Sequence, residues 1–269
     1  MVGEETEISP SYSFWFEGCN LTCSFCSTRA AQKRSSFSPA LREQSVSQAM
    51  RCVEDGTARS ISLIGGEPSV SLAGSIGLAA IFRGKTKVVF NTNLYLSEDA
   101  LELVAHAADT FIVDIHFGCE RCARVIAGAE NYLEIMTRNL QSLQHKDVLL
   151  RHLLLPGHID CCLPGVVEIV SRFPDWPFSL LTNFHPFGSD AGGVARLGPL
   201  DLETVERAEE ILTTRGIRFR TIGPDSSLHS PGYFPSGVPD ETIEVTIDRD
   251  GAVVFEAQSP SVPEIARSL

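Results

Sequence analysis

Three cysteines lie within eight residues near the start of the chain, in the segment SFWFEGCNLTCSFCSTR (13–29). Cys19, Cys23 and Cys26 have the spacing C-x3-C-x2-C. Thiolates are soft ligands that suit iron–sulfur clusters or zinc. A structural zinc site needs four protein ligands, and the nearest histidine downstream is His106. Three thiolates on one loop would hold three irons of a cubane cluster and leave the fourth iron open to a ligand that is not protein.

Ordinary packing is the alternative for these cysteines, because the free thiol behaves as a small buried hydrophobe. The residues around them disfavour that interpretation, since Gly18, Asn20, Thr22 and Ser24 are small or polar.

A second segment with chemical potential is LIGGEPS (63–69), which ends an apolar strand-like run. Gly65 and Gly66 allow the backbone to approach a ligand closely, and Pro68 fixes the turn. A plain strand-to-helix turn explains the segment by itself equally well. Its place one strand–helix unit after the cysteines favours a shared site.

The elements that must position these loops alternate along the chain. Strands are expected at 11–16, 58–64, 85–91, 110–116, 147–156, 177–184 and 217–223, and helices at 38–56, 71–82, 97–109, 130–144, 164–173 and 200–216. Such alternation predicts an α/β fold with a parallel sheet and right-handed crossovers. A complete eight-stranded barrel takes about 250 residues, so six or seven units predict an incomplete barrel, with an open doubly wound sheet as the alternative.

The chain is expected to divide into a core at residues 11–223 and a C-terminal extension at 224–269. Residues 224–240 form a Pro/Gly/Ser cluster that reads as an irregular linker. Residues 242–258 predict a β-hairpin, with Asp250 and Gly251 in its turn, which is either a flap or an added edge ribbon.

Composition excludes several classes of function. The formal net charge of -12 argues against broad nucleic-acid binding and against binding to anionic membranes. The first residues, MVGEETEISP, do not resemble a targeting segment, and no run of about 18 apolar residues occurs. A cytoplasmic location is therefore expected, in which the cysteines are reduced or bound to metal.

The segment GCNLTCSFC, with an aromatic Phe25 between its last two cysteines, resembles the cluster loop of the radical S-adenosylmethionine (SAM) enzymes. The resemblance implies a partial (β/α)6 TIM-like barrel, with a [4Fe–4S] cluster on Cys19, Cys23 and Cys26 and SAM bound at the open iron. It also implies a mechanism: one electron from the cluster cleaves SAM to methionine and a 5′-deoxyadenosyl radical, which abstracts hydrogen from the substrate.

Further segments are similar in order to those of the pyruvate formate-lyase-activating enzymes and a related branch. They are NTN (91–93), VDIHFG (113–118), RHLLLPGH (151–158) and NFHPFG (183–188), and the likeness covers roughly residues 11–190. In this family GGEP lies around the SAM ammonium group, which implies that role for Gly65, Gly66, Glu67 and Pro68.

The same resemblance places Asn91, Asn93, Arg151 and His185 near SAM. Arg151 has a structural ion pair as its alternative role.

Asp114 and His116 are the candidate catalytic residues. Asp114 matches the acid of a D-x-K strand end, but His116 stands where that pattern has lysine. A helix cap for Asp114, and a hydrogen-bonded loop histidine for His116 or His158, are the alternatives.

Four other cysteines follow the fourth and fifth strands, at positions 119, 122, 161 and 162. Loops after neighbouring parallel strands meet at one edge, so a second cluster or metal site is conceivable. Ordinary packing, and a redox or substrate-contacting role, are the alternatives. Cys52 is expected on the apolar side of its helix, packed in the protein core.

Three functions fit the sequence. The first is a radical SAM enzyme that acts on a small molecule or peptide, with a flavodoxin or ferredoxin as electron donor implied by the family. The second is an activase of a glycyl-radical enzyme, and the third is a non-catalytic iron–sulfur redox module.

Overall fold

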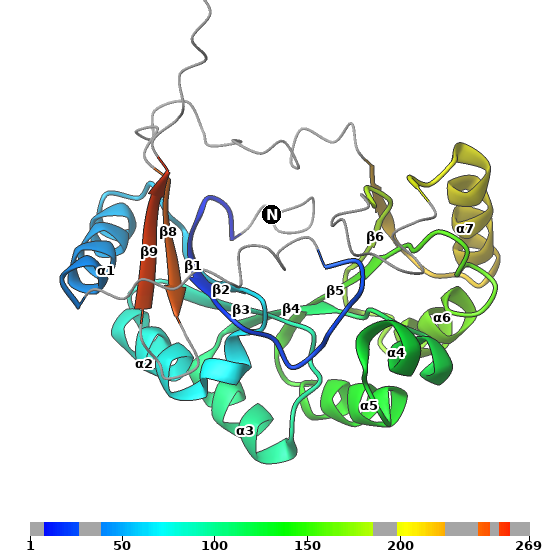
Figure 1. Cartoon of the computed structure of the whole chain (residues 1–269), viewed down its shortest axis with the longest axis horizontal. Coiled ribbons are helices and arrows are strands. Elements are labelled where there is room, and N and C mark those ends of the chain that lie inside the picture. The colour runs from blue at the N-terminus through cyan, green and yellow to red at the C-terminus, as the bar shows by residue number, and fades with distance from the viewer. Residues whose placement is uncertain (1–7, 27–38, 185–197, 224–241, 248–252, 259–269) are drawn as a thin grey trace, which may run out of the picture.

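The computed structural model describes residues 8–26, 39–184, 198–223, 242–247 and 253–258 (Figure 1). Strands and helices alternate through most of this length. Their bounds are β1 (Ser11–Phe16), α1 (Pro39–Glu54), β2 (Ser60–Gly65), the 3₁₀ turn η3 (Pro68–Ser71), α2 (Leu72–Phe82), β3 (Lys87–Thr92), α3 (Glu98–Ala107), β4 (Thr110–Asp114), α4 (Glu120–Ala127), α5 (Tyr132–Ser142), β5 (Asp147–Leu153), α6 (Leu163–Ser171), β6 (Phe178–Leu181), α7 (Leu202–Thr214), β7 (Arg220–Ile222), β8 (Thr242–Ile247) and β9 (Val253–Gln258).

The strands form one sheet in the order β7-β6-β5-β4-β3-β2-β1-β8-β9, and β1 to β7 are parallel neighbours. Because this order follows the sequence without reversal, right-handed crossovers place every connecting helix on the same face. Figure 1 shows a curved sheet with the helices along its convex side. A partial barrel is therefore confirmed over the doubly wound alternative, whose strand order reverses. The strands β1 to β7 number seven, one more than the six of a (β/α)6 barrel.

The C-terminal hairpin is confirmed as an edge ribbon. β8 and β9 pair antiparallel, and β8 pairs parallel with β1 through Trp15 with Thr246 and Phe16 with Ile247. Its expected turn at Asp250 lies outside the described residues. The division of the chain at residue 223 into a core and an extension stays a prediction.

The two faces of the sheet differ in chemistry because alternate side chains point to opposite sides. Phe14 and Phe16 on β1, with Phe90, Phe111 and Phe178 on later strands, are buried in one large core together with the helices. Among the described helices, none has both the length and the apolar character needed to cross a bilayer.

The opposite, concave face has a small apolar floor. Ile8 packs there against Val89 of β3 and Ile112 of β4, with Leu149 of β5 beside them. The carbonyl of Ile8 also accepts a hydrogen bond from the Ser60 hydroxyl at 2.6 Å. Ile8 thus covers the amino-terminal part of this face. On β3, β4 and β5 the next residues on the same face lie nearer the carboxyl ends of the strands.

Helix α4 was not expected from the sequence. Its eight residues, ERCARVIA, bury Cys122, Ala123, Ile126 and Ala127, and it ends at Gly128, whose φ of 67° is in the left-handed region. Only two turns of amphipathic pattern with two arginines separate the fourth strand from the next strong helix. So short a pattern gives a weak periodic signal.

His152 of β5 generates the first prediction. Its side chain is buried on the helix side, Nδ1–H donates to the Ile115 carbonyl at 2.7 Å, and burial lowers the pKa of the imidazole to about 4. In the unfolded chain the same imidazole takes up a proton near pH 6.5. The buried neutral side chain therefore stabilises the fold above pH 6.5, and this stabilisation is lost as the pH falls toward 4. Wild type should therefore lose about 3 kcal/mol of its free energy of unfolding between pH 7 and pH 4 through this group. His152→Gln keeps a hydrogen-bond donor but does not titrate, so this part of the pH dependence should disappear.

The measurement is the free energy of unfolding by urea between pH 7 and pH 4. His145→Gln changes an exposed histidine and is the control. Parallel pH curves for wild type and His152→Gln would contradict the assignment.

Candidate functional site

The cysteine loop follows β1 directly at the carboxyl edge of the sheet. Cys23 is buried, and Cys19 and Cys26 are half-buried. The backbone N–H of Cys26 donates to the Cys23 carbonyl at 3.2 Å, which makes a tight turn between the last two cysteines. The three thiols therefore belong to one compact loop beside the concave face, as the spacing predicts.

The GGEP segment follows β2 and is bonded to the start of this loop. Gly66 N–H donates to the Phe16 carbonyl and Glu67 N–H donates to the Gly18 carbonyl, both at 2.9 Å. A Cβ on Gly65, which has φ +126°, would lie 2.2 Å from the Phe16 carbonyl oxygen. Glycine is required here because the backbones of the two motifs touch.

The Glu67 carboxylate has a structural role that the sequence did not reveal. It is fully buried and caps η3 by accepting from Ser69 N–H at 3.1 Å. Oε1 and Oε2 also accept from the Thr92 hydroxyl at 3.0 Å, and Oε2 accepts from Asn93 N–H at 2.8 Å. Burial raises the pKa of this carboxyl, although the hydrogen bonds oppose the rise. The side chain ties the end of β2 to the end of β3.

Asn93 continues this connection back to the cysteine loop. Its Nδ2 donates to Asn20 Oδ1 at 2.8 Å and reaches Cys19 Sγ at 3.6 Å. Leu21 N–H also donates to Cys19 Sγ at 3.4 Å. Burial raises the pKa of Cys19 to about 11, and the negative charge of Glu67 adds to the rise. The Cys19 thiol is thus aimed by two N–H donors and keeps its proton until a cation replaces it.

Asn91, Asp114 and Arg151 form a polar group on the concave face. Arg151 Nε and Nη2 donate to the two oxygens of Asp114 at 2.8 and 2.9 Å, and Nη2 also donates to Asn91 Oδ1 at 2.9 Å. The Arg151 and Asp114 side chains are 14% and 26% exposed. Each lies two positions beyond the apolar floor on its own strand, so this group marks the carboxyl end of the hollow.

His116 follows β4 and packs on the cysteine loop. Its ring stands edge-on to Phe25, with centroids 6.1 Å apart, and Phe25 also contacts Phe117 and Phe184. The backbone N–H of His116 donates to the Tyr132 hydroxyl at 2.9 Å. Burial lowers the pKa of His116 against the opposing effect of Asp114, so the neutral imidazole is favoured near pH 7.

His185 and the cysteines after β4 and β5 are the remaining residues that the sequence singled out. His185 lies outside the described residues. Cys119 stands at the N-cap of α4, where the backbone N–H of Cys122 lowers the thiol pKa, while Cys122, His158, Cys161 and Cys162 gather in a separate group. Loop order alone predicted that these segments would be neighbours, but not that His158 would join them.

Gly65→Ala tests the joint between the two motifs. The new Cβ would overlap the Phe16 backbone, so the free energy of unfolding should fall by about 3 kcal/mol or more. Gly77→Ala in α2 is the matched control, because nothing lies within 4 Å of its Cβ position, and it should stabilise by about 0.5–1 kcal/mol. Urea titration measures both, and equal stability of the two variants would contradict the contact.

Known proteins resemble this chain in sequence and in fold. The family model described as the Radical SAM superfamily matches residues 14–170. An uncharacterized protein of Methanocaldococcus jannaschii is 25% identical over 178 residues, which are 64% of this chain and 52% of that relative. The chain thus matches about half the length of this curated relative.

Solved structures share the fold at low sequence identity. SuiB of Streptococcus suis, bound to S-adenosylmethionine, has a TM-score of 0.56 and 15% identity, covering 92% of this chain and 60% of that one. Coproporphyrinogen III oxidase (HemN) of Escherichia coli has a TM-score of 0.50 and 11% identity, covering 77% and 53%. Because the family model spans more than half of its residues, the chain belongs to the radical SAM superfamily, with SAM and an iron–sulfur cluster as its cofactors.

Proposed function

We propose that the chain is a radical SAM enzyme that abstracts hydrogen from a small-molecule or peptide substrate. The observation that carries this proposal is the pair of hydrogen bonds that joins the cysteine loop to the GGEP segment, Gly66 to Phe16 and Glu67 to Gly18. They bring the two motifs of the family to one place at the carboxyl edge of the sheet, where parallel α/β folds place their active sites.

The donor set fits a cubane cluster. Cys19, Cys23 and Cys26 would hold three irons through thiolates and leave one iron for SAM. Held by these residues, the cluster would supply the electron for reductive cleavage of SAM to methionine and a 5′-deoxyadenosyl radical. Asn93 and the Leu21 N–H orient the Cys19 sulfur, and Phe25 covers the loop with an aromatic surface that excludes water.

The residues proposed to bind SAM surround this loop. Gly65, Gly66 and Pro68 would contribute backbone, whereas the Glu67 carboxylate acts mainly by holding β2 against β3. Arg151, with Asn91 beside it, would face the polar part of SAM.

Asp114 and His116 are proposed to act on the substrate side. Asp114 keeps Arg151 in place, and His116 presents a neutral, half-buried imidazole beside Phe25. A neutral imidazole has one donor and one acceptor nitrogen, whereas a lysine side chain is charged and only donates. His116 therefore suits an uncharged polar substrate better than the lysine of the activating enzymes would.

A peptide substrate has support from one structural neighbour. SuiB has also been solved bound to its precursor peptide SuiA, with a TM-score of 0.57 and 14% identity to this chain. A glycyl-radical-enzyme activase remains the second proposal, because the segments at 91–93, 113–118 and 151–158 resemble that group. A flavodoxin or ferredoxin as electron donor, and a cytoplasmic location, also stay proposals.

Cleavage of SAM tests the function. Anaerobically reconstituted, dithionite-reduced protein should release 5′-deoxyadenosine from SAM, quantified by chromatography. Cys23→Ser should reduce release to the protein-free background, because the cluster loses a ligand, while Cys52→Ser on α1 should retain it. No product from protein with an intact cluster would support the redox module instead, and product that rises only with a glycyl-radical partner would support the activase.

Arg151→Lys tests the SAM contact. Lysine keeps the charge but loses the planar pairing with Asp114, so the KM for SAM should rise about tenfold with little change in kcat. Arg172→Lys, at an exposed ion pair with Glu168, is the control and should leave KM unchanged. An unchanged KM in Arg151→Lys, at unchanged thermal stability, would remove Arg151 from the SAM site.

A further inference from the structure

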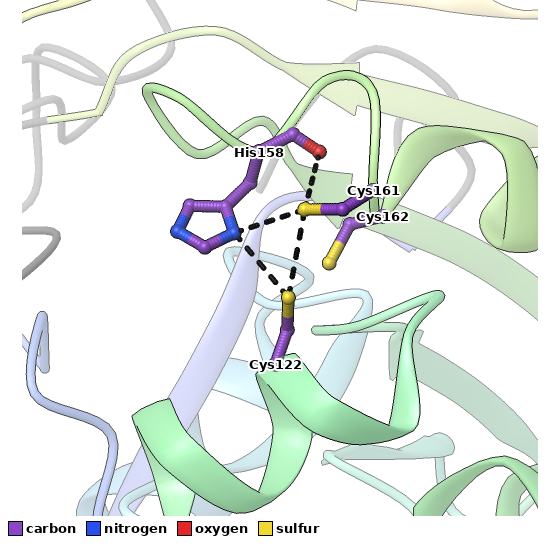
Figure 2. Close-up of side chains that lie close together, drawn as sticks. All are labelled: Cys122, His158, Cys161 and Cys162. Atoms are coloured by element: carbon purple, nitrogen blue, oxygen red, sulfur yellow. Dashed lines mark hydrogen bonds between the residues drawn. The ribbon is translucent and has the colours of Figure 1, made fainter.

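A second group of metal-ligating side chains lies apart from the cysteine loop. The sulfurs of Cys122, Cys161 and Cys162 and a ring nitrogen of His158 all lie within 4.8 Å of one another. Figure 2 shows these side chains converging from α4 and from the segment between β5 and α6. They come from two segments separated in sequence, so their convergence is a property of the fold.

The distances among three of these donors match one tetrahedral ion, and Cys162 Sγ lies within 4.8 Å of each of them. Cys122 Sγ is 3.5 Å from Cys161 Sγ, and His158 Nδ1 is 3.4 and 3.3 Å from the same two sulfurs. Metal–sulfur bonds of about 2.3 Å and metal–nitrogen bonds of about 2.0–2.1 Å place the donor atoms of a tetrahedron about 3.5–3.8 Å apart. The ligands of a cubane bind different irons and stand farther apart, so this spacing favours a single ion over a second cluster.

Two glycines allow the segments that carry these ligands to pack backbone against backbone. A Cβ on Gly118 would lie 2.0 Å from the Cys162 carbonyl oxygen, and a Cβ on Gly165 would lie 1.9 Å from the Gly118 carbonyl oxygen. These two glycines let the segment after β4 touch the start of α6. The contact holds Cys122 on one side against Cys161 and Cys162 on the other.

We propose that Cys122, His158, Cys161 and Cys162 bind one zinc ion in a four-coordinate site. Three thiolates and one imidazole form a donor set that zinc prefers, and four protein ligands leave no open position, which is typical of a structural site. Binding releases the thiol protons to solvent and involves no change of oxidation state.

The site would hold in place helix α4, which accepts hydrogen bonds from the cysteine loop. Cys122 lies in the first turn of α4, and the carbonyls at the other end of this helix accept from the loop. Thr22 N–H donates to Ala127 and Ser24 N–H donates to Ile126, both at 2.9 Å. The zinc and the iron–sulfur cluster would thus be held at opposite ends of one eight-residue helix.

The test uses the full chain in which Cys19, Cys23 and Cys26 are replaced by serine, so that the cysteine loop takes up neither iron nor zinc. After purification without oxygen and dialysis, we expect one zinc per chain by elemental analysis. Cobalt(II) added to the zinc-free protein should give the visible absorption of tetrahedral thiolate coordination. Neither readout depends on cleavage of SAM, so failure of the zinc site and failure of the proposed enzyme activity are distinguishable.

Variants in this background assign the ligands. Cys122→Ser should abolish the cobalt absorption, and Cys52→Ser should leave both signals unchanged. His158→Ala, at a half-buried loop position, should weaken zinc binding at least about tenfold and guards against misfolding of the buried Cys122 variant.

Three results of the metal analyses would overturn the proposal. They are zinc well below one equivalent in folded protein, zinc retained by both ligand variants, and iron with sulfide in place of zinc. A Cys122–Cys161 disulfide in protein kept from oxygen, found by peptide mapping, would equally overturn it in favour of a redox pair.

Discussion

The contact between the ends of β1 and β2 is the constraint on which the rest of the site depends. Two backbone hydrogen bonds cross from the GGEP segment to Phe16 and Gly18, and they are possible only because Gly65 has no side chain to separate the strands. The two strands run parallel and in register up to this point, since Phe16 pairs with Gly65. The loop for the cluster and the loop proposed for SAM therefore leave the sheet side by side.

A buried carboxylate extends this contact across a third strand. Glu67 accepts from Thr92 and Asn93 at the end of β3, and the Asn93 side chain returns to Asn20 and Cys19. Every step is a hydrogen bond within or next to the interior, where a missing partner costs more than in water. The position of one cysteine sulfur is thus set by residues from three consecutive strands.

Two kinds of feature could be predicted from the sequence: the repeated alternation of strands and helices, and motifs contained in one short segment. Alternating strands and helices gave the fold class, and β1 was predicted with the bounds it has, because polar residues follow it at once. The inward carboxylate of Glu67, the short helix α4 and the joining of His158 to Cys122, Cys161 and Cys162 were not predicted. Each depends on contacts between segments distant in sequence, such as the approach of Gly118 to Gly165, and neither periodicity nor spacing records such contacts.

The ribbon of β8 and β9 occupies the outer edge of β1, with Trp15 opposite Thr246. Almost the whole chain separates these partners. A ribosome therefore releases the first strand long before the segment that will cover it, and an uncovered strand edge is open to pairing with other chains. Every newly made copy carries such an edge next to its cysteines until β8 has been made.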